Sequence, residues 1–438
     1  MSEPAQVGGF SLLPVRVAVV GSRSAGPRWW STALVPFGLS TTTTPEGGRK
    51  RMNQAEESTT VVIVGGGVAG LALGNFLLRS GIDCVILEKR SREYVENRHR
   101  AGSLDARGVR MLREWGLGEA IEEVDHGSSD ANMPLIIDGE KRQWKMDESN
   151  ADDLDAVFCP QQVLVRNLIK IFLRDGGDLR FESEDVCLEG IDTERPVVRY
   201  RDAAGSAKAI GCDFVAGSDG YHGVSRTGIP ADVLNCYTHE FGYAWLTILA
   251  EVPANPPAVM AVHSRGFAAQ ITRGPNASRL YLQCPVTDTI DQWPDERIWS
   301  ELELRFGEPP AVKGPIVSKQ VVPLRGVVFD PMSYGRLYLV GDAAHIISPM
   351  SAEGMSLALH DAEVLARAVI QYVEKDDSSL LDSYSDTCLT HTWERQASAV
   401  WMTETMHESG DAGYAGEFRK RVARVNLETI LQPRTSDI

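Results

Sequence analysis

The chain has 438 residues, of which 43% are hydrophobic and 24% are charged, a balance typical of a soluble globular protein with more than one packed unit. Its formal net charge of −16 argues against nucleic acid as a partner, because phosphate binding requires a basic face. The cysteines are scattered without a short Cys/His cluster, which indicates reduced thiols in a cytoplasmic protein and no metal site. No stretch has the roughly 18 consecutive apolar residues of a membrane span, so we expect no membrane partner.

The first segment, residues 1–58, differs from the rest of the chain. It contains a TTTT run and several Gly and Pro residues, and it lacks a long amphipathic period. No basic start precedes its apolar run, so a signal peptide fits poorly. We expect a disordered or non-native extension, with Met52 as the alternative start because the folded pattern begins shortly after it.

The first chemical motif lies in the stretch TTVVIVGGGVAGLALGNFLLRSGIDCVILEKR, which predicts a strand, a glycine turn, a helix and a second strand. Gly65, Gly67 and Gly70 have the GxGxxG spacing, and Glu88 follows the second strand. Such glycines let backbone N–H groups approach a pyrophosphate at the positive end of a helix, while the acid accepts a hydrogen bond from a ribose hydroxyl. The pattern predicts dinucleotide binding in preference to a purely structural turn. It does not by itself distinguish FAD from NAD(P).

Two later motifs resemble ligand-binding strand ends. In CDFVAGSDGYHGVSR, Asp219 and Gly220 follow a short strand. In GRLYLVGDAAHIISPMSAEGMSLALHDA, a strand runs into Gly341-Asp342, and a loop with Pro349 leads to a helix that begins near Gly354. A carboxylate at a strand end and a glycine at a helix start both suit a polar ligand across the end of a sheet. Because the motifs lie far apart, the arrangement favours FAD held by distant parts of the chain around an inserted substrate module.

With these three motifs in this order, the chain resembles the class A flavoprotein aromatic hydroxylases from about residue 60 to 420. Local runs such as RHRAGSLDARG, VVPLRGVVFDPM and WMT agree with this resemblance. It implies an α/β fold: a Rossmann-like FAD-binding domain, an inserted, mostly antiparallel β-sheet substrate domain, and C-terminal helices. The expected boundaries are 59–235 and 325–372 for the FAD-binding domain, 236–324 for the substrate domain and 373–438 for the helical region.

The resemblance also implies the residues that hold FAD. Asp342 is expected at the ribityl chain, and the helix that begins near Gly354 offers free N–H groups to the negative charge of reduced flavin. The other expected FAD contacts lie in the glycine turn, at the second strand end, in the segment 98–103, at a helix start and at a strand end: Gly65, Gly67, Ala69, Gly70, Glu88, Arg98, Arg100, Ala101, Gly102, Ser103, Gln161, Asp219, Met355 and Ser356.

NADPH is the electron donor that the resemblance implies. The segment EKRSREYVENRHR is rich in cations and favours the extra 2′-phosphate, although a solvated charged loop is the alternative. The expected NADPH contacts are in this segment and at three family positions: Lys89, Tyr94, Arg98, His222, Arg226 and Arg325.

The chemistry implied is hydroxylation of an electron-rich aromatic by O₂ through a flavin hydroperoxide, without a nucleophilic side chain. The backbone carbonyl of Pro349 is expected to face the ring. Arg273 and Tyr281 match the family's carboxylate-binding positions, where an arginine fork suits a carboxylate, although a surface salt bridge is the alternative for Arg273. A family serine is replaced by Ile271.

The phenol end departs from the family. Met260 occupies the position of a tyrosine, the family histidine falls near Ser128, and a second, C-terminal tyrosine has no counterpart. We therefore expect a carboxylated aromatic of the substituted 4-hydroxy- or 4-aminobenzoate type, activated by a route other than the usual deprotonation. Oxidative decarboxylation or another oxygenation of a tailored benzoate is an alternative, as is a non-oxygenating FAD reductase or redox module. The resemblance implies a homodimer.

Overall fold

The computed structural model describes residues 57–98, 102–122, 132–145, 157, 159–307, 313–411 and 413–431. The expected N-terminal extension lies outside these residues, except that Glu57 and Ser58 already belong to the first strand. The described chain contains two eight-stranded sheets with helices around them, which confirms the expected α/β class with a second sheet and C-terminal helices.

The first sheet has a parallel centre, in the order β15-β8-β1-β2-β5, because its strands are joined by crossovers rather than hairpins. Val61–Val64 forms a fully buried β-branched run at its centre, as expected for a strand covered on both faces. Helix α1 (Val68–Arg79) contacts both α5 (Gln161–Arg174) and α7 (Gly354–Lys375). The strands are β1 (Glu57–Val64), β2 (Cys84–Leu87), β5 (Asp178–Arg180), β6 (Glu184–Glu189), β7 (Val197–Arg201), β8 (Ala207–Gly217), β14 (Ser333–Tyr334) and β15 (Leu337–Leu339).

The second sheet has the order β16-β13-β9-β12-β11-β10-β3-β4 and is antiparallel except for the β10–β3 pair. Helix α6 (Asp295–Phe306) covers one face, where its apolar side chains pack with Leu246, Ile248 and Leu280. The strands are β3 (Asn132–Ile137), β4 (Glu140–Lys145), β9 (Asn235–Ala250), β10 (Ala258–Val262), β11 (Ala268–Thr272), β12 (Ser278–Pro285), β13 (Ile316–Asp330) and β16 (His345–Ile346).

The β3–β4 hairpin departs from the expected domain division. It lies within the range 59–235, yet β3 pairs with β10 and thereby extends the second sheet. Its turn at Asp138-Gly139 has positive φ at both residues, as a tight two-residue hairpin requires. The second sheet is therefore assembled from three separate stretches of sequence: β3–β4, β9–β13 and β16.

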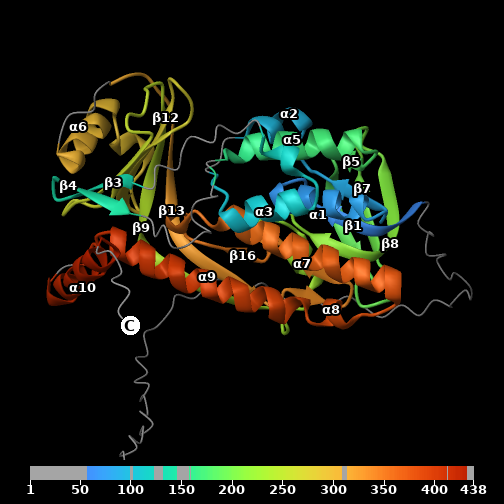
Figure 1. The fold of residues 1–438 in the computed structure, drawn as a ribbon. Helices are drawn as coiled ribbons and strands as arrows, with labels where there is room; N and C mark the ends of the chain where they lie inside the picture. The colour runs from blue at the N-terminus through green and yellow to red at the C-terminus, as the bar shows by residue number, and fades with distance from the viewer. Residues whose placement is uncertain are drawn as a thin grey trace, which may run out of the picture. The chain divides into compact units, whose positions relative to one another are not determined.

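The C-terminal helices connect the two sheets (Figure 1). Near the start of α9 (Tyr384–Met406), the Tyr384 hydroxyl donates to the Leu339 carbonyl of β15 at 2.7 Å. Just beyond the end of α9, His407 contacts β9. Helix α10 (Gly413–Leu431) follows. The remaining helical elements are α2 (Arg92–Asn97), α3 (Ala106–Glu114), α8 (Ser379–Asp382) and the 3₁₀ turns η1 (Gly118–Ala120), η2 (Ser225–Gly228), η3 (Ile290–Gln292), η4 (Gly341–Ala343) and η5 (Pro349–Ser351).

In the part of the chain that the structure describes, every helix is too short or too polar to cross a membrane.

Candidate active site

Four strands of the first sheet end side by side at its carboxyl edge. Val64 is paired with Leu87 and with Gly217, and Gly217 is paired with Leu339. The residues that follow these strand ends were singled out in the sequence: Gly65, Glu88, Asp219 and Asp342. In open α/β sheets, ligands bind at this carboxyl edge. The fold therefore brings together motifs that are far apart in the sequence.

In the glycine turn between β1 and α1, two glycines are tightly surrounded by backbone atoms and a third faces open space. Gly65 has φ +114°, and a Cβ there would lie 2.4 Å from the Ser218 carbonyl oxygen. A Cβ on Gly70 would lie 2.0 Å from the Gly65 carbonyl oxygen, whereas a Cβ on Gly67 would meet nothing within 4 Å. The N-cap residue of α1 is Gly67, which has no side chain to accept from the first N–H groups of the helix, so these groups can face a ligand. This open cradle at a positive helix end fits the pyrophosphate of FAD.

Glu88 is fixed beside this turn by two backbone groups. Its Oε2 accepts from the Gly66 N–H and its Oε1 from the Arg90 N–H, each at 2.7 Å. A carboxylate held this way at the end of β2 is placed to accept from a ribose hydroxyl.

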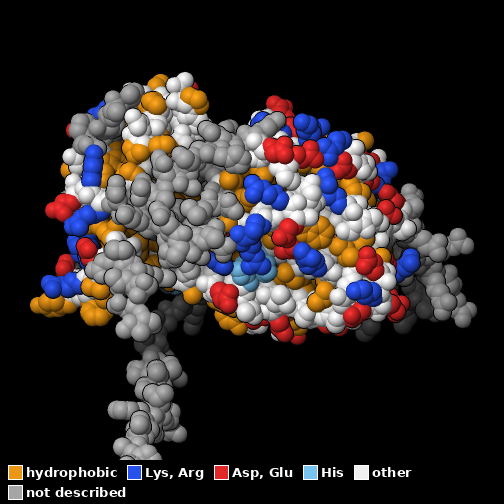
Figure 2. All heavy atoms as spheres, viewed as in Figure 1, with side chains coloured by type: hydrophobic (Ala, Val, Ile, Leu, Met, Phe, Trp, Pro, Cys, Tyr) orange, Lys and Arg blue, Asp and Glu red, His pale blue; other side chains and the backbone are white. Residues whose placement is uncertain are grey.

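The basic segment after β2 forms the short helix α2. The Tyr94 ring has the Arg90 guanidinium 5.3 Å and the Arg98 guanidinium 5.9 Å from its centroid, while Arg92 pairs with Glu96 at 2.7 Å. Acidic and basic side chains mix on the face around α2 and α5 (Figure 2). Lys89 is exposed. The residues expected to continue this cluster, Arg100 and Ala101, lie outside the described residues.

The segment after this gap runs close to two helix starts. A Cβ on Gly102 would lie 2.1 Å from the Cys159 carbonyl oxygen and 2.6 Å from the Gln161 nitrogen, so only glycine permits the approach to α5. Three residues further on, the Asp105 N–H donates to Ser356 Oγ at 3.3 Å. The segment 102–105, which contains Gly102 and Ser103, therefore lies beside two helix starts. These are the start of α5 at Gln161 and the start of α7, with Gly354, Met355 and Ser356. No side chain caps α7, so its first N–H groups are available to a cofactor.

A buried pair of side chains, Asp361 and His345, stabilises the turn that carries Asp342. The Asp361 Oδ2 accepts from the Gly341 N–H at 2.9 Å and lies 2.6 Å from His345 Nε2. Burial opposes a charge on His345, but the carboxylate of Asp361 raises the pKa of His345 above its ordinary value. The sequence reading missed both residues. The available signal was an acidic residue within the apolar stripe of α7.

Two expected nucleotide contacts, Asp219 and Arg226, also have partners within the chain. Asp219 Oδ2 accepts from the Ser225 N–H at 2.8 Å and from the Ser225 hydroxyl at 2.9 Å, and burial raises the pKa of Asp219. Arg226 donates to the carbonyls of Gly220, Tyr221 and Ala343. These bonds give Arg226 a role in holding the turn. By contrast, His222 is exposed, and Arg325 lies 4.2 Å from the centroid of Tyr221.

The residues expected at the substrate carboxylate meet on the second sheet. Arg273 follows β11, and its guanidinium interacts electrostatically with Tyr281 of the neighbouring β12. Its Nη1 donates to the Thr272 carbonyl at 3.3 Å. Burial lowers the pKa of Arg273, while Tyr281 opposes that shift. Arg273 is partly buried, which disfavours the alternative of an exposed surface salt bridge.

An apolar cluster connects this pair to the loop before α7. Buried members include Tyr281, Trp245, Phe267 and Met350, and Met260 packs against them from β10. Pro349, which precedes Met350, is exposed at the start of η5. All four expected substrate residues are thus connected with this cluster. Tyr281 and Met260 are part of it, Pro349 precedes its member Met350, and Arg273 lies beside Tyr281. The Ser128 position lies outside the described residues.

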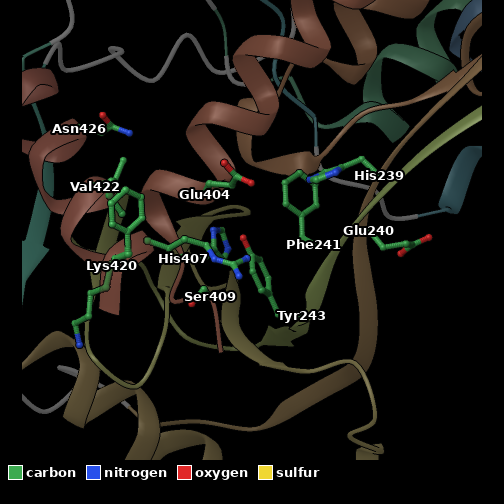
Figure 3. Close-up of a pocket in the computed structure, with 13 residues that line it drawn as sticks. His239, Glu240, Phe241, Tyr243, Glu404, His407, Ser409, Lys420, Val422 and Asn426 are labelled. Carbon is green, nitrogen blue, oxygen red and sulfur yellow. The ribbon is translucent and has the colours of Figure 1, made fainter. Parts of the chain in front are cut away.

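His407 is a further buried group that the sequence reading missed. Its Nε2 lies 2.7 Å from Trp245 Nε1 and its Nδ1 lies 2.8 Å from the Thr403 carbonyl oxygen. Burial lowers the pKa of His407 to about 3. Its ring stacks on Tyr243 and lines, with Phe241, Glu404 and side chains of α10, a cavity of about 190 Å³ (Figure 3).

Comparison with known proteins gives relatives along most of the chain. A family model described as an FAD binding domain matches residues 58–398. A p-hydroxybenzoate hydroxylase of Acinetobacter baylyi is 34% identical over 369 residues, which cover 83% of this chain and 89% of that protein. A 3-amino-4-hydroxybenzoate 2-monooxygenase of Streptomyces platensis is 25% identical over 316 residues, covering 68% and 76% of the two chains. The structure of the flavin-dependent monooxygenase PieE with FAD and substrate matches with a TM-score of 0.69 at 18% identity, over 86% of this chain and 72% of that one.

Proposed function

Because this chain belongs to the FAD-binding-domain family of flavoprotein aromatic monooxygenases, we propose that it hydroxylates a carboxylated aromatic compound with NADPH as electron donor. The observation that carries the proposal is the contact between Arg273 and Tyr281 beside the apolar cluster that reaches Pro349. Such a site combines a cation for a carboxylate with a dry surface for a ring.

The residues at the first sheet edge fit FAD, which when reduced supplies the activation of O₂. Gly67 and the start of α1 would hold the pyrophosphate, Glu88 a ribose, and Asp342 the ribityl chain. The N–H groups at the start of α7 would face the flavin. In the overall reaction, NADPH and a proton supply two electrons and two hydrogens. One oxygen atom of O₂ enters the ring, and the other leaves as water.

At the second sheet, each side chain has a separate task. The Arg273 fork binds the carboxylate with the Tyr281 hydroxyl beside it. Trp245 and Met350 exclude water from the ring, which limits wasteful formation of H₂O₂. The Pro349 carbonyl would accept a hydrogen bond from the ring substituent.

The ring substituent follows from the same cluster. The apolar Met260 stands where a proton-accepting hydroxyl would serve a phenol, so a 4-amino- or further substituted benzoate fits better than plain 4-hydroxybenzoate. The relative named 3-amino-4-hydroxybenzoate 2-monooxygenase supports a substituted benzoate.

NADPH is proposed to meet the cations near Tyr94, namely Lys89 and Arg98, together with His222 and Arg325. A homodimer and a cytoplasmic location stay predictions, as do the domain boundaries apart from the placement of the β3–β4 hairpin.

The proposal is tested with Arg273→Ala in the FAD-loaded protein. A charge-assisted hydrogen bond contributes about 1.5–3 kcal/mol, so the KM for 4-aminobenzoate should rise by about tenfold or more while FAD stays bound. The control is Arg297→Ala, which removes an exposed arginine from α6 of the same sheet. NADPH oxidation and product mass are measured against a panel of benzoates. Unchanged kinetics in Arg273→Ala would contradict the carboxylate assignment, and tight, fast hydroxylation of 4-hydroxybenzoate would contradict the substituent assignment.

A further inference from the structure

The two expected substrate contacts stand on different parts of the fold. Arg273 directly follows β11 and Tyr281 belongs to β12 of the second sheet, whereas Pro349 lies in the loop between β16 and α7. A substrate that touches both must match the distance between them. Whatever fixes that distance therefore decides which substrates fit.

A buried hydrogen bond joins the second sheet to the end of α9. An indole nitrogen can only donate, so Trp245 Nε1–H donates to His407 Nε2 at 2.7 Å. The imidazole proton must then lie on Nδ1, which donates to the Thr403 carbonyl at 2.8 Å. His407 is 5% exposed and its pKa is lowered to about 3, so it stays neutral with both nitrogens satisfied. One tautomer and one orientation are thereby fixed.

The connection continues from α9 to the Pro349 loop. Thr403 Oγ1 lies 2.6 Å from the Ala399 carbonyl and 2.7 Å from Ser348 Oγ. Because a carbonyl only accepts, the single Thr403 hydroxyl proton is donated to Ala399, and the Ser348 hydroxyl donates to Thr403. Ser348 is 1% exposed and immediately precedes Pro349.

The connection also reaches the carboxylate residues. The Trp245 ring lies 4.8 Å from the Tyr281 ring, and Tyr281 contacts Arg273. On the same strand as Tyr281, Gln283 donates to the Glu408 carbonyl at 2.5 Å and accepts from the Glu408 N–H at 3.1 Å. The chain end of α9 is thus attached to two adjacent strands of the substrate sheet.

From this continuous series of contacts we infer that His407 is a positioning residue, which sets the distance between the Arg273 carboxylate site and the ring-facing Pro349 loop. The inference rests on the proposed function. The distance selects for length: an acid whose carboxylate is attached directly to the ring fits, whereas one extra methylene adds about 1.5 Å and misaligns the ring. Without the hydrogen bond between Trp245 and His407, the Pro349 loop and the second sheet adjust to either acid.

The test compares 4-aminobenzoate with 4-aminophenylacetate in the FAD-loaded wild type, His407→Phe and Trp245→Phe. Each variant keeps an aromatic ring but removes one side of the hydrogen bond, and Trp245→Phe is the milder change. Calorimetry gives the Kd of each acid without turnover, and product formed per NADPH oxidised gives the coupling. We expect the wild-type preference for the shorter acid to fall at least fivefold in both variants. The double variant should lose little more, because both changes remove the same bond.

The matched control is Tyr384→Phe, which removes one buried hydrogen bond at the opposite end of α9. It should lower stability but keep the preference between the two acids. If the preference for the shorter acid survives in both His407→Phe and Trp245→Phe, the inference is overturned while the proposed function stays in place. A wild type that binds neither acid would overturn the proposed function, and the inference with it.

Discussion

The cofactor side and the substrate side of the proposed active site are formed by different kinds of groups. At the carboxyl edge of the first sheet, backbone groups dominate: the turn at Gly65–Gly70 and the uncapped starts of α1 and α7. On the second sheet the contacts come from side chains such as Arg273 and Tyr281. A backbone site demands glycine at fixed spacing and tolerates little change. A side-chain site can be altered residue by residue, so that related folds act on different substrates.

The two sides also differ in the surroundings of a buried histidine, which shift its pKa in opposite directions. His345 lies against the Asp361 carboxylate, which raises its pKa and favours an ion pair below the Asp342 turn. Among the described residues, the hydrogen-bond partners of His407 are a neutral indole and a backbone carbonyl, so burial lowers its pKa. One side of the site therefore rests on a buried histidine–carboxylate pair and the other on a neutral hydrogen-bond network.

The largest effect is expected for flavin binding and folding when two glycines of the same turn are replaced by alanine. Gly70→Ala places a Cβ 2.0 Å from the Gly65 carbonyl oxygen, so the turn cannot form and FAD is lost. Gly67→Ala meets nothing within 4 Å, so the protein should fold normally but bind FAD more weakly, because the methyl group enters the cradle. Bound flavin absorbance and apo-protein melting measure both. Flavin retention in Gly70→Ala, or unfolding of Gly67→Ala, would contradict the backbone description of this site.

The next effect is an opposite pH dependence for His345 and His407. For His407, whose pKa falls from 6.5 to about 3, stability is lost as pH drops below 6.5, by at most about 1.4 kcal/mol per pH unit. For His345, whose pKa is raised, the contribution is complete below 6.5 and is lost as pH rises through the raised pKa. The wild-type advantage over His407→Gln should thus shrink toward acid, and that over His345→Gln toward base. Denaturant unfolding across pH measures both, and slopes of the same sign would remove the distinction.

A smaller effect concerns the electron donor. Arg98→Gln should raise the KM for NADPH several-fold more than the KM for NADH, because only NADPH carries the extra phosphate. Arg92→Gln is the matched control, since Arg92 pairs with Glu96 on the same short helix. Steady-state kinetics with both donors give the comparison. Equal losses with NADPH and NADH would assign Arg98 to FAD alone.

The smallest effect is expected outside both sides of the site. A chain that starts at Met52 should match the full chain in melting temperature, flavin content and turnover, because the first strand begins only at Glu57. A drop of several degrees on removing residues 1–51 would show that this segment stabilises the folded part.

The sequence was most informative where local spacing encodes the backbone. The glycine turn, Glu88 and Gly341-Asp342 predicted a nucleotide edge, and the strand order brings them together. Arg273 and Tyr281 came from the resemblance, and their contact depends on the register of β11 against β12.

Other features depend on contacts between distant residues and leave no local pattern. The β3–β4 hairpin contains nothing that specifies β10 as its partner. Arg226 donates to backbone carbonyls that only the folded turn places nearby, and its nucleotide contact stays a prediction. The bond from Trp245 to His407 joins residues 162 positions apart, and a buried histidine in a helix end has no signature of its own.

The position of β15 has a consequence for how the protein is made. β15 pairs with the C-terminal end of β8, and Gly341 after it fits between α1 and α7, where a Cβ would lie 3.1 Å from Ala69 and 3.2 Å from Ala358. During translation the ribosome must therefore release the chain through α7 before the nucleotide edge is complete. Until then the C-terminal end of β8, residues 215–217, exposes an unpaired strand edge, which is prone to association with other chains. Prematurely terminated products that lack this region should emerge without flavin and require chaperones to stay unaggregated.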